Sequence, residues 1–238
     1  MRFLLKNSIL LLFLGFFLSG CSIKASKDAS FAMQLPFLEK VSYKIDPNKT
    51  LYVDEITDNR SFEIRSDGSS QSGGNNTANS MDFSVPAYNP DLHEKSKIVG
   101  AKRRVSDPKI FGAILLKDEQ TVEYMVKASI ISAAKANGYK ILKNKADIKN
   151  NTVIVKSSIN KFWTWETGAN AGVANIYTGI VEAQFTFTRN NKQLSDFTAT
   201  GKKSRHGWPK ERNFFVVINE AYKIFTDDFA DKFSNNIK

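Results

Sequence analysis

The residue with the clearest chemistry in this 238-residue chain is its single cysteine, Cys21. It ends the tetrapeptide Leu18-Ser19-Gly20-Cys21, which matches the lipobox of bacterial lipoproteins. In that reaction the cysteine thiolate takes a diacylglyceryl group, and a peptidase then cleaves before the cysteine. Small residues at 19 and 20 give the peptidase access to the backbone, while Leu18 fills an apolar subsite. We therefore predict that Cys21 is the lipid-attachment residue.

The segment before Cys21 supports this prediction. Arg2 and Lys6 precede an apolar run from Ile9 to Leu18, which is the order of regions in a secretory signal peptide. The run is too short for a permanent transmembrane helix. We expect residues 1–20 to be a lipoprotein signal peptide, and the alternative is an ordinary signal peptide with an incidental cysteine. Removing Arg2 and Lys6 lowers the net charge from +10 to +8.

Lipidation at Cys21 predicts where the chain resides and which partners it meets. Two or more acyl chains anchor a protein stably, so the membrane is the first expected partner. Ser22 follows the cysteine where aspartate would favour retention, which points to the bacterial outer membrane, on its periplasmic face. A basic chain there is attracted to anionic glycans, lipids and acidic envelope proteins. Location excludes nucleic acid.

Residues that could carry catalysis are scarce. The histidines His93 and His206 have no metal-site spacing, and no phosphate-binding loop or nucleophile elbow occurs. We therefore expect no catalytic residues, no metal, no cofactor and no enzymatic activity. The carboxylates nearest one another, Asp54, Glu55 and Asp58, leave an envelope hydrolase as a minor alternative.

Aromatic and basic residues supply two candidate contact sites. Trp163 and Trp165 alternate along an extended segment, so they share one strand face and either stack on a ligand or close the end of the core. A basic turn near residues 202–210 either meets anionic groups or is a solvated loop with its tryptophan tucked inward. Its candidate residues are Lys202, Lys203, Arg205 and Trp208.

These sites must be positioned by a domain that we place at residues 49–238, after a lipidated tether over residues 21–48. The apolar cluster at residues 31–38 is expected to dock on the body. Residues 66–80 contain no large apolar side chain, which predicts a disordered insertion over about residues 66–100. The basic cluster at residues 102–104 is expected to end that irregular region.

Hydrophobic periodicity predicts the elements of this domain. Asp118 is the expected N-cap of the first helix and Gly138 its C-terminal glycine, and Asn190-Asn191 is a hairpin turn signal. Strands are expected at residues 51–58, 110–116, 139–142, 152–165, 176–188 and 194–202, and helices at 119–137 and 213–235. The result is an α+β fold with an antiparallel or mixed sheet of about four to five strands and two amphipathic helices packed on one face.

The chain resembles the YajG-like lipoproteins of Gram-negative bacteria. The resemblance rests on the lipobox, on a first strand ending in Asp58-x-Arg60 and on Gly138-Tyr139 after the first helix. It extends to the long strand from Val153 and to the closing helix with Asn219-Glu220 and Asp227-Asp228. It implies a fold related to the auxiliary lipoproteins of envelope transporters and no catalytic residues. We therefore expect a lipid-anchored, non-enzymatic accessory lipoprotein that binds another envelope component, most simply a protein. The alternative is a glycan-, peptidoglycan- or lipopolysaccharide-binding module that uses exposed tryptophans.

Overall fold

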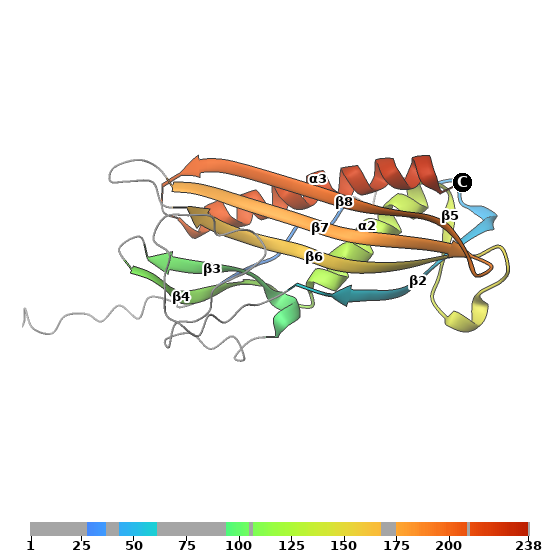
Figure 1. Cartoon of the computed structure of the whole chain (residues 1–238), viewed down its shortest axis with the longest axis horizontal. Helices are drawn as coiled ribbons and strands as arrows, with labels where there is room; N and C mark the ends of the chain where they lie inside the picture. The colour runs from blue at the N-terminus through green and yellow to red at the C-terminus, as the bar shows by residue number, and fades with distance from the viewer. Residues whose placement is uncertain are drawn as a thin grey trace, which may run out of the picture.

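A computed structural model describes residues 28–36, 43–60, 94–104, 107–167, 175–208 and 210–237. Within these ranges the chain forms an elongated sheet with two helices packed on one face (Figure 1). The predicted α+β class is confirmed, but the sheet has eight strands and not four to five. The elements are β1 (Ala29–Phe31), β2 (Asp46–Asp58), η2 (Lys95–Lys97), β3 (Ile98–Arg104), β4 (Asp107–Leu116), α2 (Val122–Ala136), β5 (Tyr139–Leu142), η3 (Lys145–Asp147), β6 (Val153–Thr167), β7 (Asn175–Arg189), β8 (Lys192–Gly207) and α3 (Glu211–Asn236).

The fifteen-residue strand β6 organises the sheet. One of its edges pairs antiparallel with β7, and β7 pairs antiparallel with β8, which confirms the predicted meander. The other edge pairs in parallel first with β2, up to Asp58↔Ile159, and then with β3, at Gly100↔Thr164. β5 lies beyond β2, whereas β4 and then β1 lie beyond β3. The sheet therefore has different strands beside β6 at its two ends.

The tight turn between β7 and β8 was correctly predicted. Asn190 and Asn191 have φ values of 49° and 60°. Positive φ at both central residues is the geometry of a type I′ turn, whose twist matches that of the flanking strands. Asparagine tolerates this conformation better than most residues, so the pair fixes the register of the longest hairpin in the sheet.

The helices follow the predicted apolar stripes, with one corrected boundary. α2 begins after Thr121, whose side chain accepts a hydrogen bond from the backbone N–H of Tyr124 at 3.1 Å. The predicted N-cap, Asp118, instead lies in the preceding turn with φ 56°. Gly138 has φ +83°, as expected for a glycine that ends a helix.

The main core lies between the helices and the sheet. The aromatic stripe predicted for α3 is buried in full. α3 approaches β8 so closely that a Cβ at Gly201 would overlap backbone atoms of Ala221 and Phe225. Glycine at this position therefore sets the distance between helix and sheet. The stripe consists of Phe214, Ile218, Ala221, Tyr222, Phe225, Phe229 and Phe233.

The predicted tether was too long, because the chain joins the sheet well before residue 49. β1 pairs in parallel with the end of β4, and the ring of Phe31 stacks on Phe215 of α3 at a centroid distance of 4.3 Å. Met33 is buried as well. The expected docking of the apolar cluster at residues 31–38 is thus confirmed for Phe31 and Met33. A three-residue strand, however, carries too little periodicity to be recognised from sequence.

The predicted irregular region also extended too far. Residues 98–104 form β3, where Ile98 and Val99 are buried, and the basic cluster at 102–104 belongs to this strand. Lys102 is 4% exposed and its Nζ pairs with Glu211 of α3 at 2.6 Å, so its charge has a partner that local sequence does not show. The rest of the predicted insertion, up to residue 93, and residues 1–27 lie outside the described residues.

Candidate functional site

The predicted tryptophan pair separates into one buried and one half-buried ring. Trp163 is 2% exposed and belongs to a second, smaller core with Ile98, Ala113 and Ile180, while Trp165 packs against its rim. The core alternative therefore holds for Trp163, and its use as an exposed ligand platform is excluded. The physical reason is that β3, which pairs with this part of β6, and β4, which lies beyond β3, contribute apolar side chains to the same small core.

The Asp58-x-Arg60 motif lies where β6 changes partner from β2 to β3. The Arg60 guanidinium donates to both carboxylate oxygens of Asp58, from Nε at 2.8 Å and from Nη2 at 2.7 Å. It also donates to the carbonyl oxygens of Ile98 at 2.7 Å, Phe162 at 3.1 Å and Lys95 at 2.9 Å. Its Cζ lies 4.6 Å from the ring centroid of Trp163. Arg60 thus closes the gap between two strands, which is a structural role.

The other predicted carboxylates also have cationic partners. Asp54 lies 3.7 Å from the Nζ of Lys145 and 3.5 Å from that of Lys156, which also pairs with Glu55 at 3.5 Å. These ion pairs account for the carboxylates without a catalytic role. Among the described residues no group of three or more potential ligands that could hold a metal ion occurs, and none of their helices is long and apolar enough to cross a membrane.

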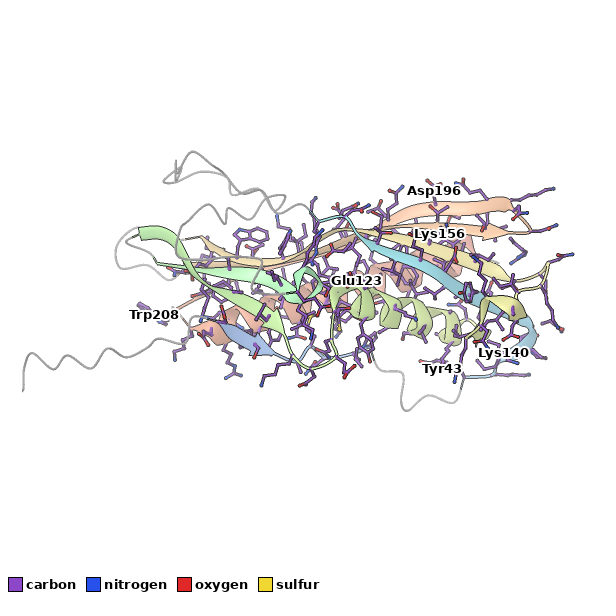
Figure 2. All side chains as sticks on the ribbon, turned by 90° about the horizontal axis from the view of Figure 1, so that it is seen from below. Tyr43, Glu123, Lys140, Lys156, Asp196 and Trp208 are labelled. Carbon is purple, nitrogen blue, oxygen red and sulfur yellow. The ribbon has the colours of Figure 1, made fainter. Side chains whose placement is uncertain are left out.

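The basic segment near residue 205 is part of a strand and not the predicted turn. The hairpin with β7 continues to Gly207, so these basic residues belong to the last third of β8. The side chains of Lys202, Lys203 and Arg205 are exposed there. Lys203 lies 3.6 Å from Glu220 of α3. Trp208 follows the strand directly and is 67% exposed, at one end of the molecule (Figure 2). Of the two alternatives for this segment, the one in which the Trp208 ring tucks inward is wrong.

The backbone carbonyl of Trp208 is held by two side chains, the half-buried Asn213 and the buried Tyr177. The carbonyl oxygen accepts hydrogen bonds from Asn213 Nδ2 at 2.7 Å and from Tyr177 Oη at 3.4 Å. Nearby, Asn175 Nδ2 donates to Glu166 Oε2 at 3.4 Å. Burial raises the pKa of Glu166, although the hydrogen bond from Asn175 opposes the shift. The exposed ring of Trp208 is therefore presented from a fixed backbone.

A groove that was not predicted lies toward the opposite end of the molecule, where Figure 2 labels Lys140. Its volume is about 720 Å³, and it runs between α2, β5 and β2. Half-buried Ile131, Ile141 and Leu142 give it apolar walls, and Ile45 is 41% exposed. Its lining residues are Ile45, Tyr52, Val53, Asp54, Lys127, Ile131, Lys135, Tyr139, Lys140, Ile141, Leu142 and Lys143.

The groove has an excess of positive charge. It includes four lysines and a single carboxylate, Asp54, which is paired with Lys145 and Lys156. Tyr139 is buried, and burial raises the pKa of its hydroxyl, so this phenol stays neutral at physiological pH. A ligand that combines an apolar surface with negative charge fits this lining.

Two separate stretches of sequence signal the groove, and neither forms a recognisable motif by itself. Lys127, Ile131 and Lys135 recur every four residues and mark a mixed stripe on one side of α2. The strand Tyr139–Leu142 carries Lys140 and is followed by Lys143. Only the packing of α2 beside β5 brings the two signals together.

Comparison with solved structures places the fold. A Xanthomonas campestris protein assigned to the family model DUF330 superposes with a TM-score of 0.51 at 7% sequence identity, over 85% of this chain and 92% of that chain. A homologue of a Helicobacter pylori neuraminyllactose-binding hemagglutinin superposes with a TM-score of 0.41 at 8% identity, over 85% and 91%. At 7% identity the first similarity shows a common fold alone. The second has a TM-score below 0.5, so we infer nothing from it.

No protein-family model matches the chain, and no curated protein matches it. Membership of the YajG-like family therefore stays a prediction. The lipobox residues Leu18, Ser19, Gly20 and Cys21 lie outside the described residues, so lipid attachment remains a prediction from sequence as well.

Proposed function

We propose that this protein is a lipid-anchored, non-enzymatic accessory lipoprotein of the bacterial envelope that binds another envelope component through the groove between α2 and β5. Cys21 provides the anchor, and the outer membrane, on its periplasmic face, is the proposed location. The observation that carries the binding role is the groove of about 720 Å³ with apolar walls and lysines at its rim.

The lining favours an acidic, amphipathic segment of a protein partner. Such a segment buries apolar side chains against Ile131 and Ile141 while its carboxylates meet Lys140 and Lys143. Burial of the apolar surface supplies affinity, and the lysines supply specificity and faster association. We therefore propose the groove, and not the tryptophan pair, as the partner-binding site.

Site-specific crosslinking in cells tests the partner. A photoreactive amino acid at position 140 is expected to capture one stoichiometric envelope protein. The same amino acid at Asp196, an exposed β8 residue (Figure 2), serves as the control and is expected not to capture it. Capture of the same abundant porins from both positions would overturn the proposed function.

The anchor has an independent test. Mass spectrometry of the mature protein is expected to find an N-terminal diacylglyceryl cysteine at position 21. An unmodified thiol at Cys21, or residues 1–20 still attached, would refute the lipoprotein assignment.

The same lining favours one second candidate, an anionic glycolipid such as lipopolysaccharide, because phosphates and acyl chains also combine negative charge with apolar surface. If this is the ligand, purified lipopolysaccharide protects Lys140 and Lys143 from acetylation, measured by mass spectrometry, and leaves the exposed Lys192 unprotected. Equal modification with and without lipopolysaccharide would exclude it.

A further inference from the structure

The end of the molecule that carries Trp208 has an aromatic and basic surface that the groove does not explain. Exposed large apolar residues here are Trp208, at 67%, and Ile176, at 37%. Ile176 pairs with His206 across the β7–β8 ladder, so both apolar groups lie at the same end of the hairpin. We call residues 202–208, with Ile176 and Lys210, the Trp208 end.

Charge at the Trp208 end is mostly uncompensated. Lys202, Arg205 and Lys210 are exposed, and Lys203 is paired with Glu220. The nearby Glu211 pairs with the buried Lys102, so its charge is already matched. No aspartate or glutamate occurs between residues 197 and 210. An exposed tryptophan flanked by lysine and arginine is the combination that stabilises protein segments at the headgroup level of an anionic bilayer.

The position of β1 brings this end close to the predicted anchor. β1 lies at the same end of the molecule as Trp208, on the left in Figure 2. Only eight residue steps separate Cys21 from Ala29, the first residue of β1. A fully extended chain covers at most about 3.6 Å per step, so an acylated Cys21 holds β1 within roughly 30 Å of the bilayer surface.

From these observations we propose that the Trp208 end is a membrane-contacting surface that binds anionic phospholipid headgroups and orients the anchored protein with its groove away from the bilayer. This inference rests on the lipid anchor of the proposed function and adds a second contact with the same membrane. The aromatic ring inserts among the headgroups, while Lys202, Arg205 and Lys210 meet lipid phosphates.

Structural features separate this proposal from ordinary surface lysines. Lysines on an edge strand often serve only to prevent strand pairing. Trp208 contradicts that explanation, because a large exposed ring promotes association instead of preventing it. Moreover, its backbone is fixed by Asn213 and Tyr177, which lowers the entropic cost of inserting the ring.

Fluorescence quenching tests contact between Trp208 and the bilayer. The full-length lipidated protein is reconstituted in vesicles of phosphatidylcholine and phosphatidylglycerol whose acyl chains carry bromine, which quenches nearby tryptophans. Quenching is expected in the wild type, to be lost in Trp208→Phe, and to persist in the matched control Trp165→Phe. Equal quenching of wild type and Trp208→Phe would overturn the proposal.

Binding without the anchor tests the charges. The mature chain with Cys21→Ser is expected to bind vesicles containing phosphatidylglycerol and not vesicles of pure phosphatidylcholine. Replacing Lys202, Arg205 and Lys210 by glutamine is expected to weaken this binding at least about 10-fold. The triple control Lys149→Gln, Lys192→Gln and Lys223→Gln, at exposed lysines outside both the groove and the Trp208 end, is expected to leave it unchanged. An equal loss in both triple variants would overturn the proposal, because it would show nonspecific attraction to the whole basic chain.

The outcome is distinguishable from that of the proposed function. If position 140 captures no partner but Trp208 is quenched by the lipid, the partner role fails and the membrane surface stands. If a photoreactive group at position 208 captures an acidic protein and the lipid does not quench Trp208, the membrane surface fails and that end is a protein interface.

Discussion

Two places in this protein combine an arginine with a tryptophan, and they differ in almost every physical respect. Arg60 is 1% exposed, donates to Asp58 and to three carbonyl groups, and lies over the ring of Trp163. Arg205 is exposed on β8, three residues before the exposed Trp208. The first pair joins strands, and the second faces solvent.

The difference teaches that residue type alone does not identify a binding surface in this fold. A buried guanidinium is tolerated because each of its polar directions is satisfied by the protein. The basic groups at the Trp208 end have few such partners among the described residues, so they remain available to an external anion. Hydrogen-bond satisfaction, and not composition, separates structure from function here.

Replacing each arginine tests this comparison with the largest expected effect. Arg60→Met is expected to lower the free energy of unfolding by about 3–5 kcal/mol, because it leaves the buried Asp58 carboxylate without its cation. Arg205→Met is expected to change it by less than about 0.5 kcal/mol. Urea denaturation of the two variants measures both values, and similar losses would break the comparison.

Replacing each tryptophan gives the second test. Trp163→Ala removes a fully packed ring from the smaller core and is expected to cost about 3–5 kcal/mol. Trp208→Ala is expected to be nearly neutral in stability, because the protein uses the Trp208 carbonyl oxygen and not the ring. Thermal unfolding monitored by circular dichroism compares them. A large loss in Trp208→Ala would show that the ring has a packing role.

The outer edge of β8 provides a smaller test. Asp228 of α3 accepts the backbone N–H of Thr200 at 2.9 Å and pairs with Lys232, which donates to the carbonyl oxygen of Thr198. Asp228→Ala is expected to cost about 1 kcal/mol, because it leaves the N–H of Thr200 without this acceptor. Asp231→Ala, at an exposed position of the same helix, is the control and is expected to be neutral. Equal unfolding midpoints in urea would contradict this role.

Glu166 gives the smallest expected effect, and its sign depends on pH. Because burial raises the pKa of the folded carboxyl, Glu166 contributes stability below its ordinary pKa of 4.5 that is lost as pH rises through the folded pKa. Glu166→Gln is therefore expected to gain stability relative to wild type on going from acid to neutral pH. Urea titrations across that range measure the difference, and a constant difference would contradict the expectation.

Periodic elements were predictable from sequence because their signals are local. The apolar stripe of α3, the Asn190-Asn191 turn and Gly138 each reflect the conformation of a few neighbouring residues. The same signals predicted the hairpin of β7 and β8, although β8 extends to Gly207 and not to Lys202.

Long-range features were not predictable in the same way. From sequence, Lys102 marks only the end of an irregular region, because its partner, Glu211, lies 109 residues away. For Trp163 the sequence leaves core and surface as alternatives, because β3, which pairs with β6, and β4, which pairs with β3, come beside it only in three dimensions. The groove likewise depends on α2 packing beside β5. Sequence therefore located the candidate basic residues but not which of them face solvent.

The length of β6 has a consequence for where the protein does its work. Fifteen residues at about 3.3 Å each make a strand of roughly 50 Å, and the groove and the Trp208 end lie toward its opposite ends (Figure 2). A body resting on the bilayer by one end would carry its groove several nanometres into the periplasm. The sheet would then act as a rigid spacer that sets the height at which a partner is met.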